Sequence, residues 1–549
     1  MYQQVLDPVG GSLGLTSIFA VVPLLTLFVL LGALRMPAQW ASLIALAVAI
    51  VVALAVYSMP IGQTLDAAAW GAAFGLFPIM WIVVNAIWIY RMTVDTGHFQ
   101  VLRRSFASIS DDQRIQAIII AFSFGALIEA LAGFGTPVAI TSVMLIALGL
   151  QPLKAAAVAL VANTAPVAFG AIATPVITLG AVTDISPDTL GAIVGRQTPV
   201  LALIVPLILV GMVDGARGIR QTWPAAVVGG LSFAVAQFVS SNYVSIELTD
   251  IIAALVSVTA IVLLLRVWSP SEPLLGEPAM PAMAGADGDD PALERRHGAR
   301  PGGDSRADVV GAYAPYLLII AIFSIAQVAA VKEALDSVTS AFAWPGIDVV
   351  KPGGKPYDAT FKFNWLAAAG TLLLISGLAT MAVLRVGLGR ALRAYAATLD
   401  QLKWAILTVA AVLALAFVMN TSGQTVTLGL WLAGAGGFFA FLSAFIGWLG
   451  VAVTGSDTSS NSLFGALQVA AAKDAGLSPA LMAAANSSGG VLGKMISPQN
   501  LAIGAAAVGM AGREGDIFRV VLKWSVLLVV LMAALVYLQS TPVLSWMLP

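Results

Sequence analysis

Apolar runs of roughly 20 residues, the length that spans about 30 Å of hydrocarbon as a helix, recur along almost the whole chain and are separated by short polar loops. This pattern predicts an all-α polytopic membrane protein with about 12 spans. The predicted spans are 15–34, 38–57, 68–90, 155–182, 191–212, 222–241, 250–267, 311–331, 364–384, 404–421, 479–509 and 519–540.

Two further apolar stretches, 115–150 and 430–472, are each long enough for two short arms. Small and polar residues interrupt them midway, with GFGTP at 133–137 and GSDTSSN at 455–461. We interpret both stretches as re-entrant hairpins. Lipid does not hydrogen-bond to irregular backbone, so each tip must lie within protein or beside a polar cavity.

The segment 268–310 differs from the rest of the chain, because it is rich in Pro, Gly, Asp and Arg and has no hydrophobic period. This composition predicts a disordered cytoplasmic linker between two halves. The first half is predicted at 1–212, with three spans, hairpin 115–150, broken helix 155–182 and span 191–212. A connecting span pair at 213–267 and the linker follow. The second half is predicted at 311–549, with three spans, hairpin 430–472, broken helix 479–509 and the last span.

One motif occurs twice: Asn followed by Ser or Thr, Gly seven residues after the Asn, then Ser or Thr followed by Pro. Pro removes a backbone donor and Gly weakens a helix, so each copy predicts a helix broken at the membrane midplane. Ordinary kinks are the alternative, but equal spacing in both halves favours a site. The copies are Asn163-Thr164 with Gly170 and Thr174-Pro175, and Asn486-Ser487 with Gly493 and Ser497-Pro498.

Positive charge gives the orientation. Lys and Arg gather in alternate loops, and the loops 58–67, 183–190 and 242–249 contain neither. Cytoplasmic loops hold the positive excess, so both termini are predicted to be periplasmic and the two hairpins to enter from opposite sides. The halves then form inverted repeats. The basic and aromatic stretch 385–403 is expected to lie along the inner interface.

Four charged residues stand out inside the predicted membrane segments, where a charge costs on the order of 2.5–3.5 kcal/mol. Glu129 and Asp457 are candidates for carrying a coupling proton, because burial raises the pKa of a carboxyl. Lys494 and Arg196 are candidates for pairing with an anion. The alternatives are that Lys494 pairs structurally with Asp457 and that Arg196 snorkels to the interface.

Composition narrows the function further. Charged residues make up 10% of the chain, the net charge is −1, and the mean hydropathy is +0.94. A nucleic-acid partner is therefore not expected. Cysteine is absent and the two histidines, His98 and His297, are far apart, so no metal centre or cofactor is expected. Nothing in the sequence indicates an enzyme. A channel would need a continuous polar stripe, whereas these polar residues cluster at tips and breaks.

Four stretches, at 127–140, 162–175, 454–468 and 484–505, resemble the L-lactate permease family, and the similarity in span pattern covers nearly the whole chain. The resemblance implies proton-coupled symport of L-lactate, D-lactate and glycolate across a bacterial inner membrane, with the lipid bilayer as the protein's environment. It also implies membership of a wider ion transporter superfamily, with elevator-like alternating access and a homodimer.

The tips and breaks are expected to bind the substrate. Backbone amides at helix ends favour a carboxylate, and Asn, Ser and Thr side chains can bind both a carboxylate and a neighbouring hydroxyl. Such groups are also suitable Na⁺ ligands, so a sodium-coupled carrier of a small carboxylate stays open beside the proton symporter. The expected substrate-binding residues are Gly135, Thr136, Asn163, Thr164, Ser456, Thr458, Ser459, Asn486, Ser487, Ser488 and Lys494.

Overall fold

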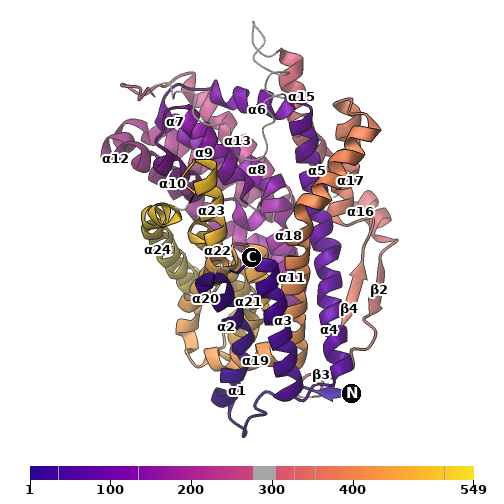
Figure 1. The fold of residues 1–549 in the computed structure, drawn as a ribbon. Coiled ribbons are helices and arrows are strands. Elements are labelled where there is room, and N and C mark those ends of the chain that lie inside the picture. The colour runs from indigo at the N-terminus through magenta and orange to yellow at the C-terminus, as the bar shows by residue number, and fades with distance from the viewer. Residues whose placement is uncertain (35, 134, 276–304, 327, 353, 512) are drawn as a thin grey trace.

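The computed structural model describes residues 1–549 except 35, 134, 276–304, 327, 353 and 512 (Figure 1). Most of the predicted linker at 268–310 thus lies outside the described residues. Among those described, nine helices are long and apolar enough to cross a membrane, or ten if the bent pair Pro152–Ala162 and Val167–Thr183 is one span. The predicted all-α polytopic membrane fold is confirmed.

Helices make up most of the chain. The helical elements are α1 Leu13–Ala20, α2 Val22–Phe28, η1 Val29–Ala33, α3 Ala38–Ala55, α4 Ile61–Phe74, η2 Gly75–Met80, α5 Trp81–Asp95, α6 His98–Ala107, α7 Gln113–Gln116, η3 Ala117–Phe124, α8 Gly125–Ala132, α9 Thr136–Ala147, α10 Pro152–Ala162, η4 Val167–Phe169, α11 Gly170–Thr183, α12 Pro187–Tyr243, α13 Thr249–Leu265, α15 Arg306–Ala326, α16 Ala329–Asp336, α17 Ala369–Val383, α18 Leu388–Ser422, α19 Gln424–Ala433, η5 Gly436–Phe438, α20 Phe439–Thr454, α21 Asp457–Asp474, α22 Pro479–Gly493, η6 Lys494–Ile496, α23 Pro498–Ala507, α24 Glu514–Gln539 and η7 Ser545–Met547.

One helix, α12, is long enough for more than one span, because it has 57 residues. A straight helix of that length would measure about 85 Å, well over twice the hydrocarbon thickness. Its backbone is non-helical at Asp214 and Gly215. The two predicted spans at 191–212 and 222–241 therefore correspond to the two parts of α12 on either side of this break.

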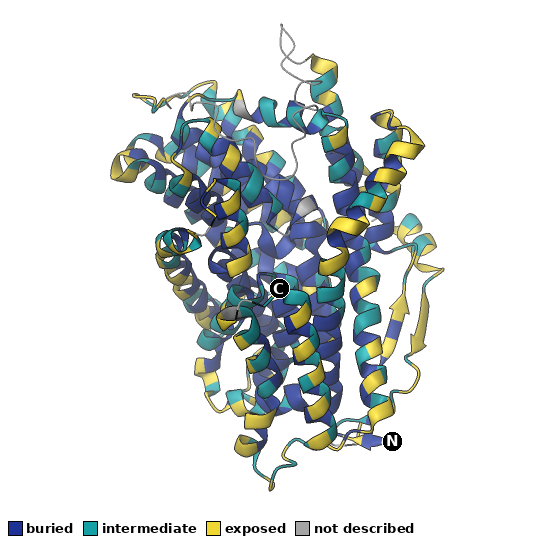
Figure 2. Ribbon diagram, in the orientation of Figure 1, coloured by how far each residue is buried: buried dark blue, intermediate teal, exposed yellow. Residues whose placement is uncertain are grey.

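The helices form two bodies that lie side by side (Figure 1). The long-helix body contains α2, α3, α4, α5, α17 and α18, which pack mainly on one another. The hairpin body contains both predicted hairpins and both Asn-to-Pro motifs, in α8–α11 and α20–α23, together with α12, α13 and α24. Buried residues concentrate along the middle of the molecule, where the two bodies meet (Figure 2).

One segment expected along the interface belongs to the same helix as a predicted span. The stretch 385–403, expected along the interface, continues without interruption into the predicted span 404–421 as the 35-residue helix α18. Its sequence explains this difference, because Leu388–Ser422 contains no Pro and is rich in Ala and Leu, the residues most favourable to a helix. Trp70 of α4 packs edge-on against Phe417 of α18, with ring centroids 4.7 Å apart.

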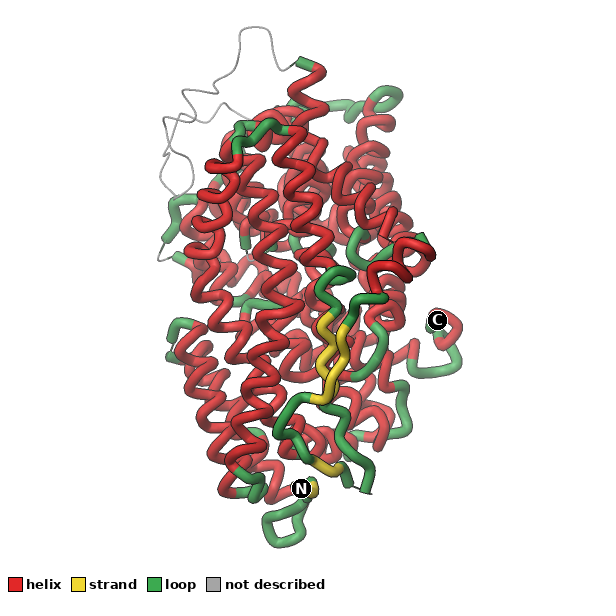
Figure 3. The backbone as a smooth tube through the Cα atoms, turned by 90° about the vertical axis from the view of Figure 1, so that its right-hand side faces the viewer, coloured by secondary structure: helices red, strands yellow, loops and turns green. Residues whose placement is uncertain are grey.

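The N-terminal residues close the end of α18. Strand β1 (Tyr2–Gln3) pairs in parallel with β3 (Val349–Val350). The Tyr2 hydroxyl donates to the Ser422 carbonyl at 2.9 Å, and Gln4 Nε2 donates to the Asn420 and Thr421 carbonyls. These bonds satisfy carbonyls that a helix end leaves without partners. Strands β2 (Ser340–Ala343) and β4 (Thr360–Phe363) form an antiparallel pair in the same loop, which the sequence did not predict (Figure 3).

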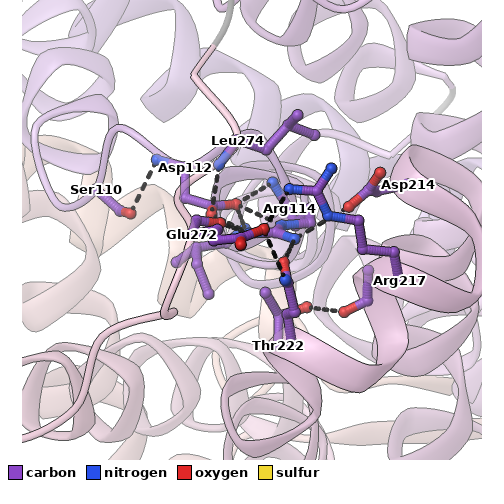
Figure 4. Close-up of polar contacts among 11 residues, drawn as sticks. Ser110, Asp112, Arg114, Asp214, Arg217, Thr222, Glu272 and Leu274 are labelled. Carbon is purple, nitrogen blue, oxygen red and sulfur yellow. Dashed lines mark hydrogen bonds and ion pairs between the residues drawn. The ribbon is translucent and has the colours of Figure 1, made fainter.

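A buried arginine holds the start of α7 against the break in α12 (Figure 4). Arg114 is fully buried and forms ion pairs with Asp112 at 2.7 Å and with Asp214 at 3.0 Å. It also donates to Gln221 Oε1 and to the Glu272 carbonyl. Three parts of the chain, the start of α7, the break in α12 and the segment at Glu272, therefore depend on one guanidinium.

Asp112 adds a pH dependence to this cluster. Burial alone would raise the pKa of Asp112, but hydrogen bonds from the Arg114 side chain and from the backbone N–H groups of Leu274 and Arg114 outweigh burial and lower it. A lowered pKa in the folded state adds stability at pH values above the ordinary Asp pKa. That stability is lost as the pH falls through the lowered value.

We expect Arg114→Met to destabilise the protein by about 3–5 kcal/mol, because it leaves buried carboxylates without their cation. Thermal unfolding of the purified protein in detergent measures the change. Arg217→Met is the matched control, since Arg217 and Glu272 form an exposed ion pair and such pairs contribute little. Equal melting temperatures for Arg114→Met and the control would contradict the prediction.

Candidate functional site

The first hairpin turns at two glycines. Helix α8 ends because Gly133 leaves the helical region (φ −50°, ψ −141°), and Gly135 adopts a left-handed conformation (φ 87°) just before α9. Pro137 then stands in the first turn of α9, where its missing N–H costs nothing. A Cβ on Gly135 would collide with the Ile503 side chain of α23. The tip of the first hairpin therefore contacts α23 in the second half of the chain.

The first Asn-to-Pro motif is broken twice, at its beginning and again just before Thr174-Pro175. Helix α10 ends at Ala162, and the chain bends by 64° before α11 continues. Within α11, Ala171, Ile172 and Ala173 have φ values of 44°, 55° and 55°. Side chains disfavour this left-handed region, and three such residues in succession hold strain that the surrounding packing must stabilise.

The second motif is broken only near its end, at η6 Lys494–Ile496. These residues stand at the same motif positions as Ala171–Ala173, so the end breaks match as the equal spacing predicted, and the first motif has an additional break. Helix α22 runs from Pro479 to Gly493 and includes Asn486, Ser487 and Ser488 as helical residues. The break follows at η6, and Ser497 caps α23. One residue explains the additional break in the first motif. Pro166 lies three positions after Asn163, whereas Gly489 lies three positions after Asn486. Pro cannot continue a helix, and Gly can.

A buried ion pair joins the first half of the chain to the second. Lys494 Nζ lies 2.6 Å from Glu129 Oε1, and the two side chains are 7% and 4% exposed. Asn163 Nδ2 donates to the other Glu129 oxygen at 3.0 Å. The sequence offered Asp457 as the structural partner of Lys494, but the structure pairs Lys494 with Glu129. Glu129 packs so closely against Gly170 that a Cβ there would lie 2.8 Å from Oε1.

Asp457 lies at the start of α21, beside α22. Its Oδ2 accepts from Ser487 Oγ at 2.6 Å and from Asn461 Nδ2 at 3.4 Å, and it is 2% exposed. Its Oδ1 has no hydrogen-bond partner among the described residues. This oxygen faces Gly490, where any Cβ would overlap it.

Glu129 and Asp457 belong to one site because the residues that they contact, Lys494 and Gly490, lie one helical turn apart along α22 and η6. Gly490 and Lys494 are four residues apart and therefore on the same helical face. Asp457 contacts that face at Gly490, and Glu129 contacts it at Lys494. The site is thus assembled from α8, α21, α22, η6 and the first break.

A chain of amide groups supports this assembly, and the sequence did not single it out. Asn486 Nδ2 donates to Asn461 Oδ1, and Gln468 Nε2 donates to Asn486 Oδ1. Asn461 also donates to the Pro175 carbonyl of α11 at 3.1 Å, which ties the second hairpin to the first broken helix. Asn461 lies four residues after Asp457 on α21, so helical spacing from Asp457 could have identified it.

The remaining predicted residues fall into three groups. Ser488 Oγ and Asn163 Oδ1 are buried without hydrogen-bond partners among the described residues. The Thr164 hydroxyl donates to the Val161 carbonyl, and the Thr458 carbonyl accepts from the Ser462 hydroxyl. At the tips, Ser456 caps α21 by accepting from the Ser459 N–H, and the Thr136 N–H donates to the Gly133 carbonyl.

Arg196 lies apart from this cluster. Its guanidinium donates to Asn242 Oδ1 and to the Met547 carbonyl near the C-terminus, both at 2.9 Å. These bonds hold α12 to the C-terminal segment. Neither of these hydrogen bonds, among the described residues, reaches a hairpin.

Two cavities lie between the long-helix body and the hairpin body. One, of about 1030 Å³, is lined by Trp404 of α18 and reaches Ser456, Ser459 and Pro498 at the second tip and break. The other, of about 880 Å³, is lined by Trp70, Phe417 and the C-terminal part of α11. Asp457 and Lys494 are buried and are not among the residues that line the first cavity, although Ser456 and Ile496 beside them in the chain are.

The model of the family described as L-lactate permease matches residues 16–543. The chain belongs to the L-lactate permease family. It is 43% identical to glycolate permease GlcA of Escherichia coli K12, with 98% of each chain covered. It is 41% identical to the L-lactate permeases of Bacillus subtilis strain 168 and Escherichia coli K12, with the whole of each chain covered.

As a member of the L-lactate permease family, the chain is a multi-pass membrane transporter and not an enzyme. Among solved structures, the Alcanivorax borkumensis YdaH transporter aligns with a TM-score of 0.45 and 14% identity over 86% of each chain. A likeness at that level carries no argument about this chain.

We expect Lys494→Met to destabilise this L-lactate permease family member by about 3–5 kcal/mol, because Glu129 would stay buried without a cation. The double variant Glu129→Gln/Lys494→Met should recover most of that loss, since it removes both charges. Thermal unfolding in detergent measures both changes.

Lys403→Met is the matched control for this cycle, because Lys403 and Asp400 form an exposed pair on α18. A double variant as unstable as Lys494→Met alone would show that the pair is not the source of the loss.

Proposed function

We propose that the protein imports L-lactate and related small 2-hydroxy monocarboxylates, D-lactate and glycolate, by proton symport. The observation that carries this proposal is Asp457, a buried carboxyl with one unbonded oxygen beside the hydroxyl of Ser487 and the amide of Asn461. Relatives at 41–43% identity named L-lactate permease and glycolate permease support the substrate class.

Recognition of a 2-hydroxy acid needs donors for the carboxylate and a partner for the hydroxyl. The region around the second tip offers both, since Ser456 and Ser459 line the cavity and Ser488 Oγ is unbonded among the described residues. Lys494 is held by Glu129, so it can act on the substrate only by sharing its charge or by opening the ion pair.

Charge explains why a proton should accompany the substrate. Two like charges 4 Å apart repel by about 4 kcal/mol at an effective dielectric constant of 20, which is close to a thousandfold in affinity. A lactate anion beside ionised Asp457 would meet repulsion of that order. Protonated Asp457 removes it, so proton and anion favour each other's binding.

Alternating access is proposed to be elevator-like, with the hairpin body moving against the long-helix body. Support comes from the two cavities, which lie at different places along the seam between these bodies. The proposal places the protein in a bacterial inner membrane as a homodimer with both termini periplasmic.

In liposomes containing the purified protein, we expect an inwardly directed proton gradient to drive accumulation of labelled L-lactate. Unlabelled glycolate and D-lactate should compete, and acetate, which lacks the 2-hydroxyl, should compete at least about tenfold less well, in line with one lost polar contact.

Removing sodium from both sides provides the control. Unchanged accumulation supports a proton symporter, whereas loss of accumulation without sodium would favour the sodium-coupled carrier. Indifference to the pH gradient contradicts the proposed coupling, and competition by acetate equal to that by lactate contradicts recognition of the hydroxyl.

Asp457→Asn should retain exchange of labelled for unlabelled lactate and lose accumulation driven by the proton gradient. Asparagine resembles the protonated carboxyl in shape and charge, so substrate binding survives while the proton site is lost. Asp474→Asn, at the far end of the same helix, is the matched control. Accumulation by Asp457→Asn equal to wild type would remove Asp457 from the coupling step.

A further inference from the structure

A second buried carboxyl lies outside the cluster described above. Asp250, in the first turn of α13, is fully buried. Its Oδ1 accepts a hydrogen bond from Gln237 Nε2 at 3.3 Å, and its Oδ2 has no hydrogen-bond partner among the described residues. A buried ionisable group in a membrane segment is costly, and it usually marks a functional site.

No described cation neutralises Asp250. Helix α13 packs against α12, α8 and η3. The charged residue of these elements that acts on Asp250 is Glu129 of α8, which has the same sign and is paired with Lys494. On α12, Arg196 is bonded to Asn242 and Met547, and Asp188 is exposed. The remaining charges of α12, Asp214, Arg217 and Arg220, lie beside the break at Gly215, where Asp214 pairs with Arg114 and Arg217 pairs with Glu272.

Gln237 connects Asp250 to the first break. The same Nε2 amide donates to the Ala165 carbonyl at 3.3 Å, and Gln237 Oε1 accepts from Thr198 Oγ1 at 3.1 Å. Ala165 directly follows Asn163-Thr164, where α10 ends. The break is therefore held on one side by the bond from Asn163 to Glu129 and on the other by Gln237 and Asp250.

We propose that Asp250 is a proton-binding site of the transport cycle, separate from Asp457, and that its protonation adjusts the first break through Gln237. This inference rests on the proposed proton symport. The carboxylate takes up one proton from water when the hairpin body exposes it and returns it on the other side. No bond other than O–H forms or breaks.

The hydrogen-bond switch follows from charge. An ionised carboxylate accepts a stronger bond than a neutral one, so ionised Asp250 draws the Gln237 amide toward itself. Protonated Asp250 accepts more weakly, and Gln237 then favours the Ala165 carbonyl. Asp250 and Asp457 have no ion-pair partner among the described residues, so protonation of the two carboxyls would act on both Asn-to-Pro motifs.

The test uses the full-length protein in liposomes, with wild type, Asp250→Asn and the exposed control Asp188→Asn measured together. We expect Asp250→Asn to keep lactate exchange within about threefold of wild type. Its accumulation driven by a gradient of one pH unit should fall at least about tenfold, because one proton crossing such a gradient supplies a tenfold driving force. The pH dependence of its apparent lactate affinity should flatten, which a merely structural residue would not cause. Asp188→Asn should match wild type in all three measurements.

The outcomes separate this inference from the proposed function. A wild type that ignores the pH gradient contradicts proton symport itself. A wild type that responds, with Asp250→Asn accumulating lactate equally well and with an unchanged pH profile, overturns the role of Asp250 alone. Failure of Asp250→Asn to reach the membrane also overturns it, because asparagine resembles the protonated carboxyl that the cycle must tolerate.

Discussion

The ion pair between Glu129 and Lys494 is the constraint on which the centre of this transporter depends. It joins α8 of the first half to η6 of the second, between residues 365 positions apart in the sequence. Separating two buried charges costs several kcal/mol, because each would remain in a medium that solvates it poorly. The two halves of the hairpin body are therefore expected to move together, with Asn163 holding the first break to the same carboxylate.

This pair also sets the charge balance of the site. Lys494 is neutralised by Glu129, so Asp457 and Asp250 have no cation in direct contact among the described residues. An incoming anion would add a further negative charge to a buried region. Protons are the smallest positive charges that can restore neutrality there, and they need no cage of ligands. The same arrangement thus explains both the proposed substrate and the proposed coupling ion.

The sequence predicted those features that depend on local patterns. Apolar length predicted the helices, and the Gly-rich and Ser-rich interruptions predicted both tips, where α8 gives way to α9 and α20 to α21. It did not predict which carboxylate Lys494 contacts, because pairing across 365 residues leaves no periodic signal. The strands β1–β4 were missed for a related reason, since each has only two to four residues.

The additional break in the first half gives the two halves of the hairpin body different chemistry. In the first, Pro166 ends the helix at Asn163, so the break frees backbone groups such as the Ala165 carbonyl, which Gln237 then binds. In the second, Gly489 lets α22 continue, so Asn486, Ser487 and Ser488 present side chains from a regular helix. A regular helix positions side chains more firmly than an irregular segment. Under the proposed function, the second half is therefore the better place for selecting the substrate, and the first for responding to its arrival by a change in backbone.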